Sequence, residues 1–329
     1  MRSISRRLAL STGLAALTAL TTLTAPLAAH AQAYPAKPVK IVVPYPPGGG
    51  TDILGRLVAA KLQEAWGQTV TVENKAGASG VLGNDMVAKS APDGHTVLLA
   101  ITAIVQSPAL MKLPYDPYKD LLPVSQLATS SSMLAVRADL PVNTVAEYVA
   151  LVKSQPGKHA YGSYGNGTSS HIQGENFKHL TKTDLAHVPY KGSAPMLNDL
   201  LGGQLSSAFV DASSGRSFIV GGKLKVLAST GTERQELAPK APTFHELNMP
   251  GFEPRGWFGF FLPAGTPPAV VQKLSVELQR ITKLPDVAKR IDDLGLDPVG
   301  STPEAFAAVV KKDGALYAKL IKDLNIKLD

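Results

Sequence analysis

The chain contains no cysteine among its 329 residues. This excludes disulfide bonds, thiol catalysis and thiolate metal sites. Charged residues make up only 18% of the sequence and hydrophobic residues 44%. That composition suits a globular protein and is too apolar for a disordered chain. The length allows one large domain or two of medium size.

Excess positive charge is also scarce in the main part of the chain. The net charge is +7, but three arginines lie in the first 33 residues, which contain no acid, so the remainder carries +4. The other basic residues are spread singly rather than in runs, which argues against a nucleic-acid partner. A mild positive field still favours small anions.

The first 33 residues have the pattern of a secretory signal. Arg2, Arg6 and Arg7 precede an apolar stretch rich in Ala, Leu and Thr, and small residues alternate at Ala29-His30-Ala31-Gln32-Ala33. Cleavage is expected after Ala31 or Ala33. The alternative is a membrane anchor, which Pro26 and the threonines disfavour. The arginine pair leaves Sec and twin-arginine export both open. We expect a periplasmic protein without a membrane span after signal removal.

From residue 34 onward the pattern predicts alternating strands and helices. Both halves contain a strand, a glycine loop and a helix in succession, which is typical of parallel α/β units. The predicted strands are 39–43, 69–73, 96–101, 123–127, 133–137, 159–161, 185–188, 205–211, 223–230 and 256–262. The predicted helices are 54–66, 81–90, 144–154, 169–180, 194–201, 267–281, 285–293 and 303–324.

Two α/β halves predict two lobes with a ligand cleft between them. The expected division places 34–137 with 255–329 in the first lobe and 138–254 in the second. Segments 123–127 and 133–137 are expected to pair with one another. In open α/β sheets, the loops at the carboxyl ends of strands form the binding crevice.

Glycine loops supply the candidate binding residues. Gly48-Gly49-Gly50 follows a buried strand and precedes a helix with Thr51 and Asp52 as cap candidates. Backbone N–H groups there can hold an anion, although a plain flexible turn is the alternative. The loop lacks the Gly-Lys-Ser/Thr ending that a nucleotide loop needs. The segments 161–168 and 74–80 are similar loops, each open to the same two interpretations.

Single polar residues at predicted strand ends complete the candidates. Thr102 can donate a hydroxyl, and Asp211 can either accept from a ligand or cap the next helix. His171 is expected to be a packing or capping residue. The candidate ligand-binding residues are Tyr45, Pro47, Gly48, Gly49, Gly50, Thr51, Ala78, Ser79, Thr102, Ser163, Asn166, Thr168 and Asp211.

Catalytic and metal motifs are missing from the sequence. There is no His-Glu-x-x-His pair and no Gly-x-Ser-x-Gly elbow. We therefore expect no metal, no cofactor and no enzyme activity. A secreted α/β hydrolase remains the alternative from a different class.

A set of motifs spread along residues 44–267 resembles the Bug/TctC solute-binding proteins, the periplasmic receptors of tripartite tricarboxylate transporters. The motifs include Pro44–Asp52, Asn74–Gly83, Ala91–Thr96, Leu113–Asp116, Tyr161–His171, Val188–Gly192, Gly202–Gln204 and Pro263–Pro267. One departure is Gln106-Ser107-Pro108, where related sequences often carry a shorter amide.

The resemblance implies a type II-like periplasmic-binding fold with two crossing segments as a hinge. It also implies a monomer that binds a small carboxylate, held by backbone amides, hydroxyls and water rather than arginine. Di- and tricarboxylates, amino-dicarboxylates and aromatic acids are all compatible with it. The expected partner is a membrane permease; a sensor that presents ligand to a membrane kinase is the alternative.

Overall fold

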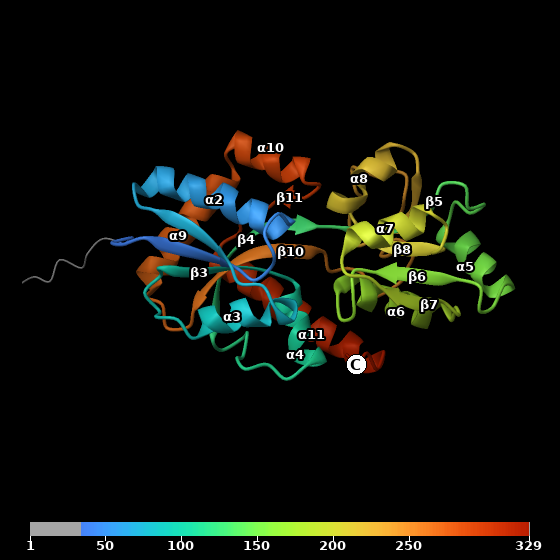
Figure 1. Cartoon of the computed structure of the whole chain (residues 1–329), viewed down its shortest axis with the longest axis horizontal. Helices are drawn as coiled ribbons and strands as arrows, with labels where there is room; N and C mark the ends of the chain where they lie inside the picture. Colours follow the sequence, from blue (N-terminus) through green and yellow to red (C-terminus); the bar gives the residue numbers. More distant parts are fainter. Residues whose placement is uncertain (1–33, 329) are drawn as a thin grey trace, which may run out of the picture.

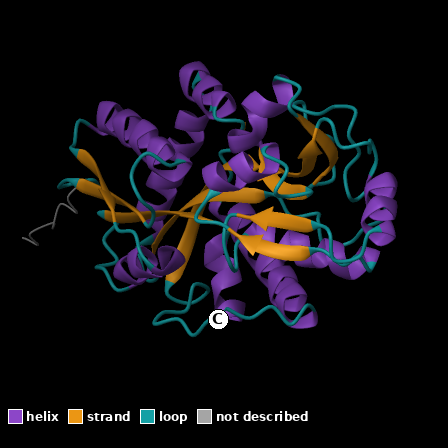
Figure 2. Cartoon of the chain, turned by 45° about the vertical axis from the view of Figure 1, so that its right-hand side comes forward, coloured by secondary structure: helices purple, strands orange, loops and turns teal. Residues whose placement is uncertain are grey.

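Two β-sheets, each covered by helices on both faces, organise the residues that this computed structural model describes, 34–328 (Figure 1). The predicted secretory signal, residues 1–33, lies outside the described residues. Figure 2 shows the two sets of strands side by side, with helices around each of them.

The first sheet has the strand order β11-β4-β10-β3-β1-β2. β1 pairs in parallel with β2 and β3, while β10 runs antiparallel to both β3 and β4. The strands are β1 Val39–Val43, β2 Val70–Asn74, β3 Thr96–Ile101, β4 Leu121–Ser130, β10 Gly256–Pro263 and β11 Asp297–Pro298. The helices of this lobe are α2 Gly50–Trp66, α3 Val81–Ala88, α4 Ala103–Leu110, α9 Pro268–Thr282, α10 Pro285–Asp293 and α11 Pro303–Asp323, with a 3₁₀ turn at Ala78–Gly80.

The second sheet has the order β7-β6-β8-β5-β9. β6 is parallel to β7 and β8, and β5 is antiparallel to β8 and β9. The strands are β5 Ser132–Arg137, β6 Ala160–Ser163, β7 Ala186–Pro189, β8 Ser207–Asp211 and β9 Leu224–Ser229. The helices are α5 Val145–Ser154, α6 Ser169–Thr181, α7 Ser193–Leu201 and α8 Ala212–Val220.

Apolar side chains on both faces of the sheets explain the strand sequences. In β1, Ile41 and Val43 enter the core beneath α2 and α9, whereas Val42 enters the opposite core beneath α3 and α11. A strand buried on both faces is rich in β-branched residues, and in β1 the exposed Lys40 alone interrupts such a run. The second sheet likewise separates a core under α5 and α6 from one under α7 and α8.

Helix ends follow local signals in the sequence. Gly67 closes α2 in the left-handed conformation, with φ of 63°. The Thr144 hydroxyl caps α5 by accepting from the backbone N–H of Glu147 at 3.1 Å. Proline opens α9, α10 and α11, where its missing N–H has no helical partner to lose.

The predicted boundary after residue 137 puts one strand in the wrong sheet. β5 pairs with β8 and β9 of the second sheet, so the chain crosses between the sheets at Ser131. Segments 123–127 and 133–137 are therefore not paired with one another. Both carry buried apolar residues, and sequence alone does not say which sheet receives them.

The second crossing returns the chain from β9 to β10. Arg255, just before β10, donates from Nε to the hydroxyl of Ser131 at 2.8 Å and forms an ion pair with Asp297 of β11. One guanidinium thus links the two crossing segments. Among residues 34–328, no helix combines the length and the apolar character needed to cross a membrane.

Candidate functional site

A cavity of about 420 Å³ lies where the two lobes face each other. Residues from both sheets and from the first crossing, at Ser131, line it. They are Gly50, Thr51, Ile101, Thr102, Ala103, Gln106, Ser130, Ser131, Ser132, Tyr164, Thr168, Ser169, Ser170, Gln173, Ser193, Asp211, Ser213, Ser214, Gly256, Trp257 and Phe258. We call this cavity the cleft.

Five helices begin at the cleft. The first residues of α2 and α4 reach it from the first lobe, and those of α6, α7 and α8 reach it from the second. No side chain caps the N-terminus of α2, α4, α6 or α7, whereas Asp211 caps α8. The leading N–H groups of a helix have no partner within the helix, so four of these ends keep donors for other acceptors.

The electrostatics of the cleft favour an anion without using a cationic side chain. Within residues 34–328, no lysine or arginine lines the cleft, and Asp211 is the only charged lining residue. Each helix N-terminus carries a positive partial charge, and together these ends complement a negatively charged group. Hydroxyl groups of the lining serines and threonines add further donors.

The first glycine loop reaches the cleft only at its end. Gly50 and Thr51 line the cleft, while Pro47, Gly48 and Gly49 are exposed outside it. The backbone N–H of Gly48 donates to Oδ2 of Asp52 at 2.9 Å. The helix begins at Gly50, after a Gly49 cap position, so Thr51 and Asp52 lie in its first turn rather than capping it.

Asp52 anchors this loop from inside the helix. Its carboxylate also accepts from Nε of Arg56 and from Nδ2 of Asn74, at 3.1 and 2.9 Å. The Arg56 bond, helped by Gly48 and Asn74, lowers the pKa of Asp52 to about 2 despite burial. A charged Asp52 therefore holds the loop in place at neutral pH.

Tyr45 supports the same region from behind. Its side chain packs against the first core and touches Gly80, and it does not line the cleft. Burial raises the pKa of Tyr45 well above its ordinary value, so its phenol is neutral. Ala78 and Ser79 form the neighbouring 3₁₀ turn with positive φ values of 46° and 55°, and they also lie outside the cleft lining.

The second glycine loop divides in the same way. Thr168 lines the cleft, but Asn166 and Ser163 do not. Ser163 is fully buried, and its hydroxyl lies 2.7 Å from Nε2 of His187. Thr168 donates from Oγ1 to the carbonyl of Gly165 at 2.7 Å, which closes the loop on itself.

Thr102 and Asp211 both line the cleft while performing structural roles. Oγ1 of Thr102 accepts from the backbone N–H of Trp257 at 2.8 Å, which ties β3 to β10. Oδ1 of Asp211 accepts from the backbone N–H of Ser214 at 2.8 Å, so the capping interpretation of Asp211 is confirmed. Its binding interpretation stays a prediction.

Three residues that line the cleft, Tyr164, Gln106 and Gln173, are not among the binding residues predicted from the sequence. Oη of Tyr164 accepts from the backbone N–H of Asp211 at 2.5 Å, and burial beside that carboxylate raises the pKa of Tyr164. Gln106 donates from Nε2 to the hydroxyl of Ser169 at 2.8 Å, which joins the lobes across the cleft. Gln173 is 6% exposed, and its Oε1 has no hydrogen-bond partner in the described part of the chain.

The serine-rich helix starts were missed as well, although one signal was available. Ser169, Ser170, Ser193, Ser213 and Ser214 all fall in the first turns of helices that follow strands of the second sheet. Serine is favoured at such positions, and strand ends of this kind meet at one edge of the sheet.

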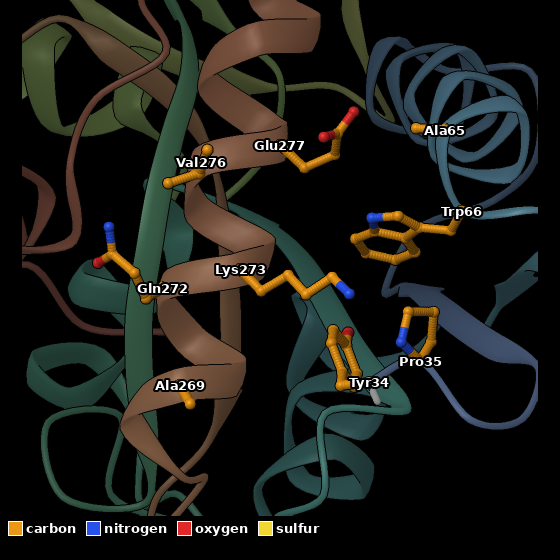
Figure 3. Close-up of a pocket in the computed structure, with 9 residues that line it drawn as sticks. All are labelled: Tyr34, Pro35, Ala65, Trp66, Ala269, Gln272, Lys273, Val276 and Glu277. Carbon is orange, nitrogen blue, oxygen red and sulfur yellow. The ribbon is translucent and has the colours of Figure 1, made fainter. Parts of the chain in front are cut away.

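A second cavity, of about 790 Å³, lies at the far end of the first lobe. It is lined by Tyr34, Trp66 and one side of α9, and Figure 3 shows Lys273 reaching from α9 toward both rings. The rings of Tyr34 and Trp66 meet edge to face at 5.6 Å. Among the described helices, only α9 brings its N-terminus to this cavity, through Ala269. The cavity therefore offers fewer helix N–H donors than the cleft does.

Solved structures of other proteins share the two-lobed fold. The periplasmic binding protein BugD is 35% identical, with a TM-score of 0.76 and coverage of 90% of this chain and 100% of that chain. Rpa4515 from R. palustris, solved with adipate, is 32% identical, with a TM-score of 0.78 and the same coverage. MatC from Rhodopseudomonas palustris, solved with bound malate, is 31% identical, with a TM-score of 0.73 and coverage of 88% and 100%.

Sequence comparison points to the same group of proteins. The protein BugT of Bordetella pertussis is 33% identical over 301 residues, which are 91% of this chain and 92% of BugT. The model of the tripartite tricarboxylate transporter family receptor matches residues 54–326. The chain therefore belongs to the TctC family of tripartite tricarboxylate transporter receptors, and the resemblance and the periplasmic-binding fold expected from its sequence are confirmed.

Proposed function

We propose that the chain is an extracytoplasmic receptor that holds a small dicarboxylate in the cleft and delivers it to a membrane permease. The convergence of four uncapped helix N-termini on a cavity without lysine or arginine carries this proposal. Such ends supply preorganised N–H donors that need little reordering when an anion arrives.

The placement of the donors favours a ligand with two acidic ends. The N-termini of α2 and α4 belong to one lobe and those of α6 and α7 to the other, so a carboxylate can be held from each side. The related proteins solved with malate and adipate support a dicarboxylate of four to six carbons. The cleft volume lies in the range usual for small-molecule sites.

Backbone and hydroxyl donors are sufficient in energy. A charge-assisted hydrogen bond contributes about 1.5–3 kcal/mol net, so five or six of them contribute roughly 8–18 kcal/mol. Association costs about 4–15 kcal/mol. Micromolar binding, near −8 kcal/mol, is therefore within reach without an arginine.

Closure of the lobes on the ligand belongs to the same proposal. Ser131 and the segment before β10 are the crossing points, and Gln106 reaches Ser169 across the cleft. A hinge at the crossings lets the two sets of helix N-termini approach the ligand from opposite sides.

Calorimetric titration with malate, adipate, citrate and propionate tests the proposal. We expect binding of at least one di- or tricarboxylate and weaker binding of the monocarboxylate. Thr51 is 6% exposed and lines the cleft, so Thr51→Val should weaken binding by about 1–3 kcal/mol if its hydroxyl meets the carboxylate. Thr71→Val, at an exposed position of β2, is the matched control and should bind the acids as tightly as the unmodified chain does. Absence of heat and of thermal stabilisation with every acid would contradict the proposal.

A further inference from the structure

Two histidines behind the cleft form a stack with a tyrosine. His187 of β7 stacks on His171 of α6, with ring centroids 4.1 Å apart and an interplanar angle of 5°. Its ring also stacks on Tyr161 of β6, at 4.9 Å and 21°. His171 is 7% exposed. The stack therefore fills the space between α6 and the edge of the second sheet.

Each histidine is bonded to the glycine loop that borders the cleft. The backbone N–H of Gly167 donates to Nδ1 of His171 at 3.0 Å. The hydroxyl of Ser163 lies 2.7 Å from Nε2 of His187 and accepts from the backbone N–H of Gly165 at 3.2 Å. The hydroxyl accepts from Gly165 in either tautomer of His187, and it can donate to Nε2 when that nitrogen carries no proton. His171 thus holds the loop directly through its Nδ1 lone pair, and His187 holds it indirectly through Ser163.

The loop in turn sets the position of cleft residues. Gly165 and Gly167 have φ values of 137° and 74°, a backbone conformation that glycine adopts readily. Thr168, which lines the cleft, bonds the Gly165 carbonyl through its hydroxyl, and α6 begins directly afterwards. Loss of either histidine bond would therefore act on the start of α6, where its N–H donors face the cleft.

His171, His187 and Glu175 offer ligand atoms within 4.8 Å of one another, but their bonding disfavours a metal ion. Parallel stacked rings cannot both aim an in-plane lone pair at one ion between them. The Glu175 carboxylate is already bonded by Lys178 at 2.9 and 3.0 Å and by Oη of Tyr161 at 2.7 Å. With Nδ1 of His171 accepting from Gly167, the neutral ring carries its proton on Nε2, which leaves no free lone pair.

Protonation has a different consequence at each ring. At His187, the Ser163 hydroxyl can reverse, accept from Nε2 and turn its own proton to the Gly165 carbonyl, which lies 3.3 Å away. At His171, the partner is a backbone N–H, which cannot accept. Protonated Nδ1 would then face the N–H of Gly167 with no acceptor between them, and the bond would be lost.

The charged groups that face the pair do not remove this sensitivity. The charged neighbours are Glu175 and Lys178, both on α6, and they form an ion pair with each other. Tyr161 from β6 is neutral. Leu328, from the segment after α11, packs at Gly167. Burial is the largest cause that lowers the pKa of both histidines, and the proximity of His171 lowers that of His187 further, to about 4. Because the rings interact, the pair takes up protons in two coupled steps.

We propose that the stacked His171–His187 pair is a proton-sensitive support for the loop Gly165–Thr168, so that acidification frees the loop and weakens ligand binding in the cleft. The ligand-binding half of this inference rests on the proposed function. The neutral pair holds the loop directly through Nδ1 of His171 and indirectly through Ser163, and a proton on Nδ1 of His171 removes the direct bond. Affinity should therefore be highest above the titration range of the pair and should fall as pH decreases through it.

Matched variants separate the pair from the titration of the ligand itself. His171→Asn places an amide oxygen near the position of Nδ1, and His187→Gln places one near the position of Nε2, so both keep an acceptor that cannot be protonated. His245→Asn, at an exposed position, is the control. The dissociation constant of the best-binding dicarboxylate is measured from about pH 7.5 to about pH 4 for each protein, so that the scan reaches the titration range of the pair.

We expect the unmodified chain and His245→Asn to lose at least about threefold more affinity than the double variant His171→Asn/His187→Gln over this range. Equal losses in all three proteins would overturn the inference. A ligand-free measurement on the unmodified chain tests the support directly: the NMR amide signal of Gly167 should shift with the titration of His171. A stationary Gly167 signal while the rings titrate would also overturn it. If no acid binds at any pH, the proposed function fails, while the NMR titration still decides the role of the pair.

Discussion

Asp313 provides a test of a buried charge that stands directly behind the cleft. Its side chain, on α11, is 5% exposed, and its Oδ2 accepts from the indole Nε1 of the cleft residue Trp257 at 3.0 Å. Burial raises the pKa of Asp313 to about 6, because the Trp257 bond offsets only part of the lost hydration. The ionised carboxylate is therefore less stable in the folded chain than in the unfolded one.

The sign of the pH effect follows from proton binding. Between about pH 4 and about pH 6 the folded chain holds more protons at Asp313 than the unfolded chain does. The free energy of unfolding consequently falls as pH rises through this window and stays lower above it. A rise from 3.8 to about 6 corresponds to about 3 kcal/mol of destabilisation at neutral pH.

The substitution Asp313→Asn removes the charge and keeps an oxygen for the indole N–H. Its amide N–H₂ group needs hydrogen-bond partners of its own, so about 1 kcal/mol is subtracted from the expected gain in the free energy of unfolding. We therefore expect Asp313→Asn to raise the free energy of unfolding by about 1–3 kcal/mol at pH 7 and to change it little at about pH 4. Asp313→Ala removes the acceptor as well, so it should be less stable than Asp313→Asn by about 1–3 kcal/mol at both pH values.

Urea unfolding followed by far-UV circular dichroism, at several pH values from 4 to 7, measures these differences. The comparison of the Asn and Ala variants separates the charge from the hydrogen bond to Trp257. If Asp313→Asn is no more stable than the unmodified chain at pH 7, or if its advantage does not depend on pH, the carboxylate is not destabilised by burial and the reasoning is refuted.

Three further results are expected. Thr144→Ala should lower the free energy of unfolding by about 1 kcal/mol, because the hydroxyl caps α5 at the N–H of Glu147; a variant as stable as the unmodified chain in urea unfolding would contradict this. Gly174→Ala should cost about 1–3 kcal/mol in the same assay, since its new methyl group would overlap the ring of Tyr161, and an unchanged midpoint would show that the ring moves freely. Small-angle scattering should show a smaller radius of gyration when a tight-binding acid is added; if the open and bound forms scatter alike, the lobes do not close.

Elements with strong local signals were predicted well from the sequence. The apolar run 96–101 and the helix 285–293, which opens with proline, have the predicted bounds. The two short helices α4 and α8 were missed. Pro108 lies inside α4 and argues against a helix there, and α8 begins with the run Ala212–Gly215, whose serines and glycine are typical of a loop.

The main error in the predicted fold is the assignment of β5 to the first sheet, and its cause is physical. β4 and β5 are separated by Ser131 alone, with no glycine or proline to mark a boundary. Both strands bury apolar residues, so their composition is the same whichever sheet they join. Long-range pairing with β8 and β9 decides the matter, and that information is distributed over distant parts of the chain.

The cleft shows the same division between local and distant information. Gly50, Thr51 and Thr168 reach it because a strand, a loop and a helix start follow one another in the sequence, and that order is visible locally. Gln173 lies one helical turn inside α6, and its approach to the cleft depends on how α6 packs on the second sheet. Trp257 depends on the return of β10 to the first sheet, next to Thr102. A sequence pattern therefore predicts which helix ends supply donors to the cleft, whereas the side chains that close its walls are determined by packing between elements far apart in the chain.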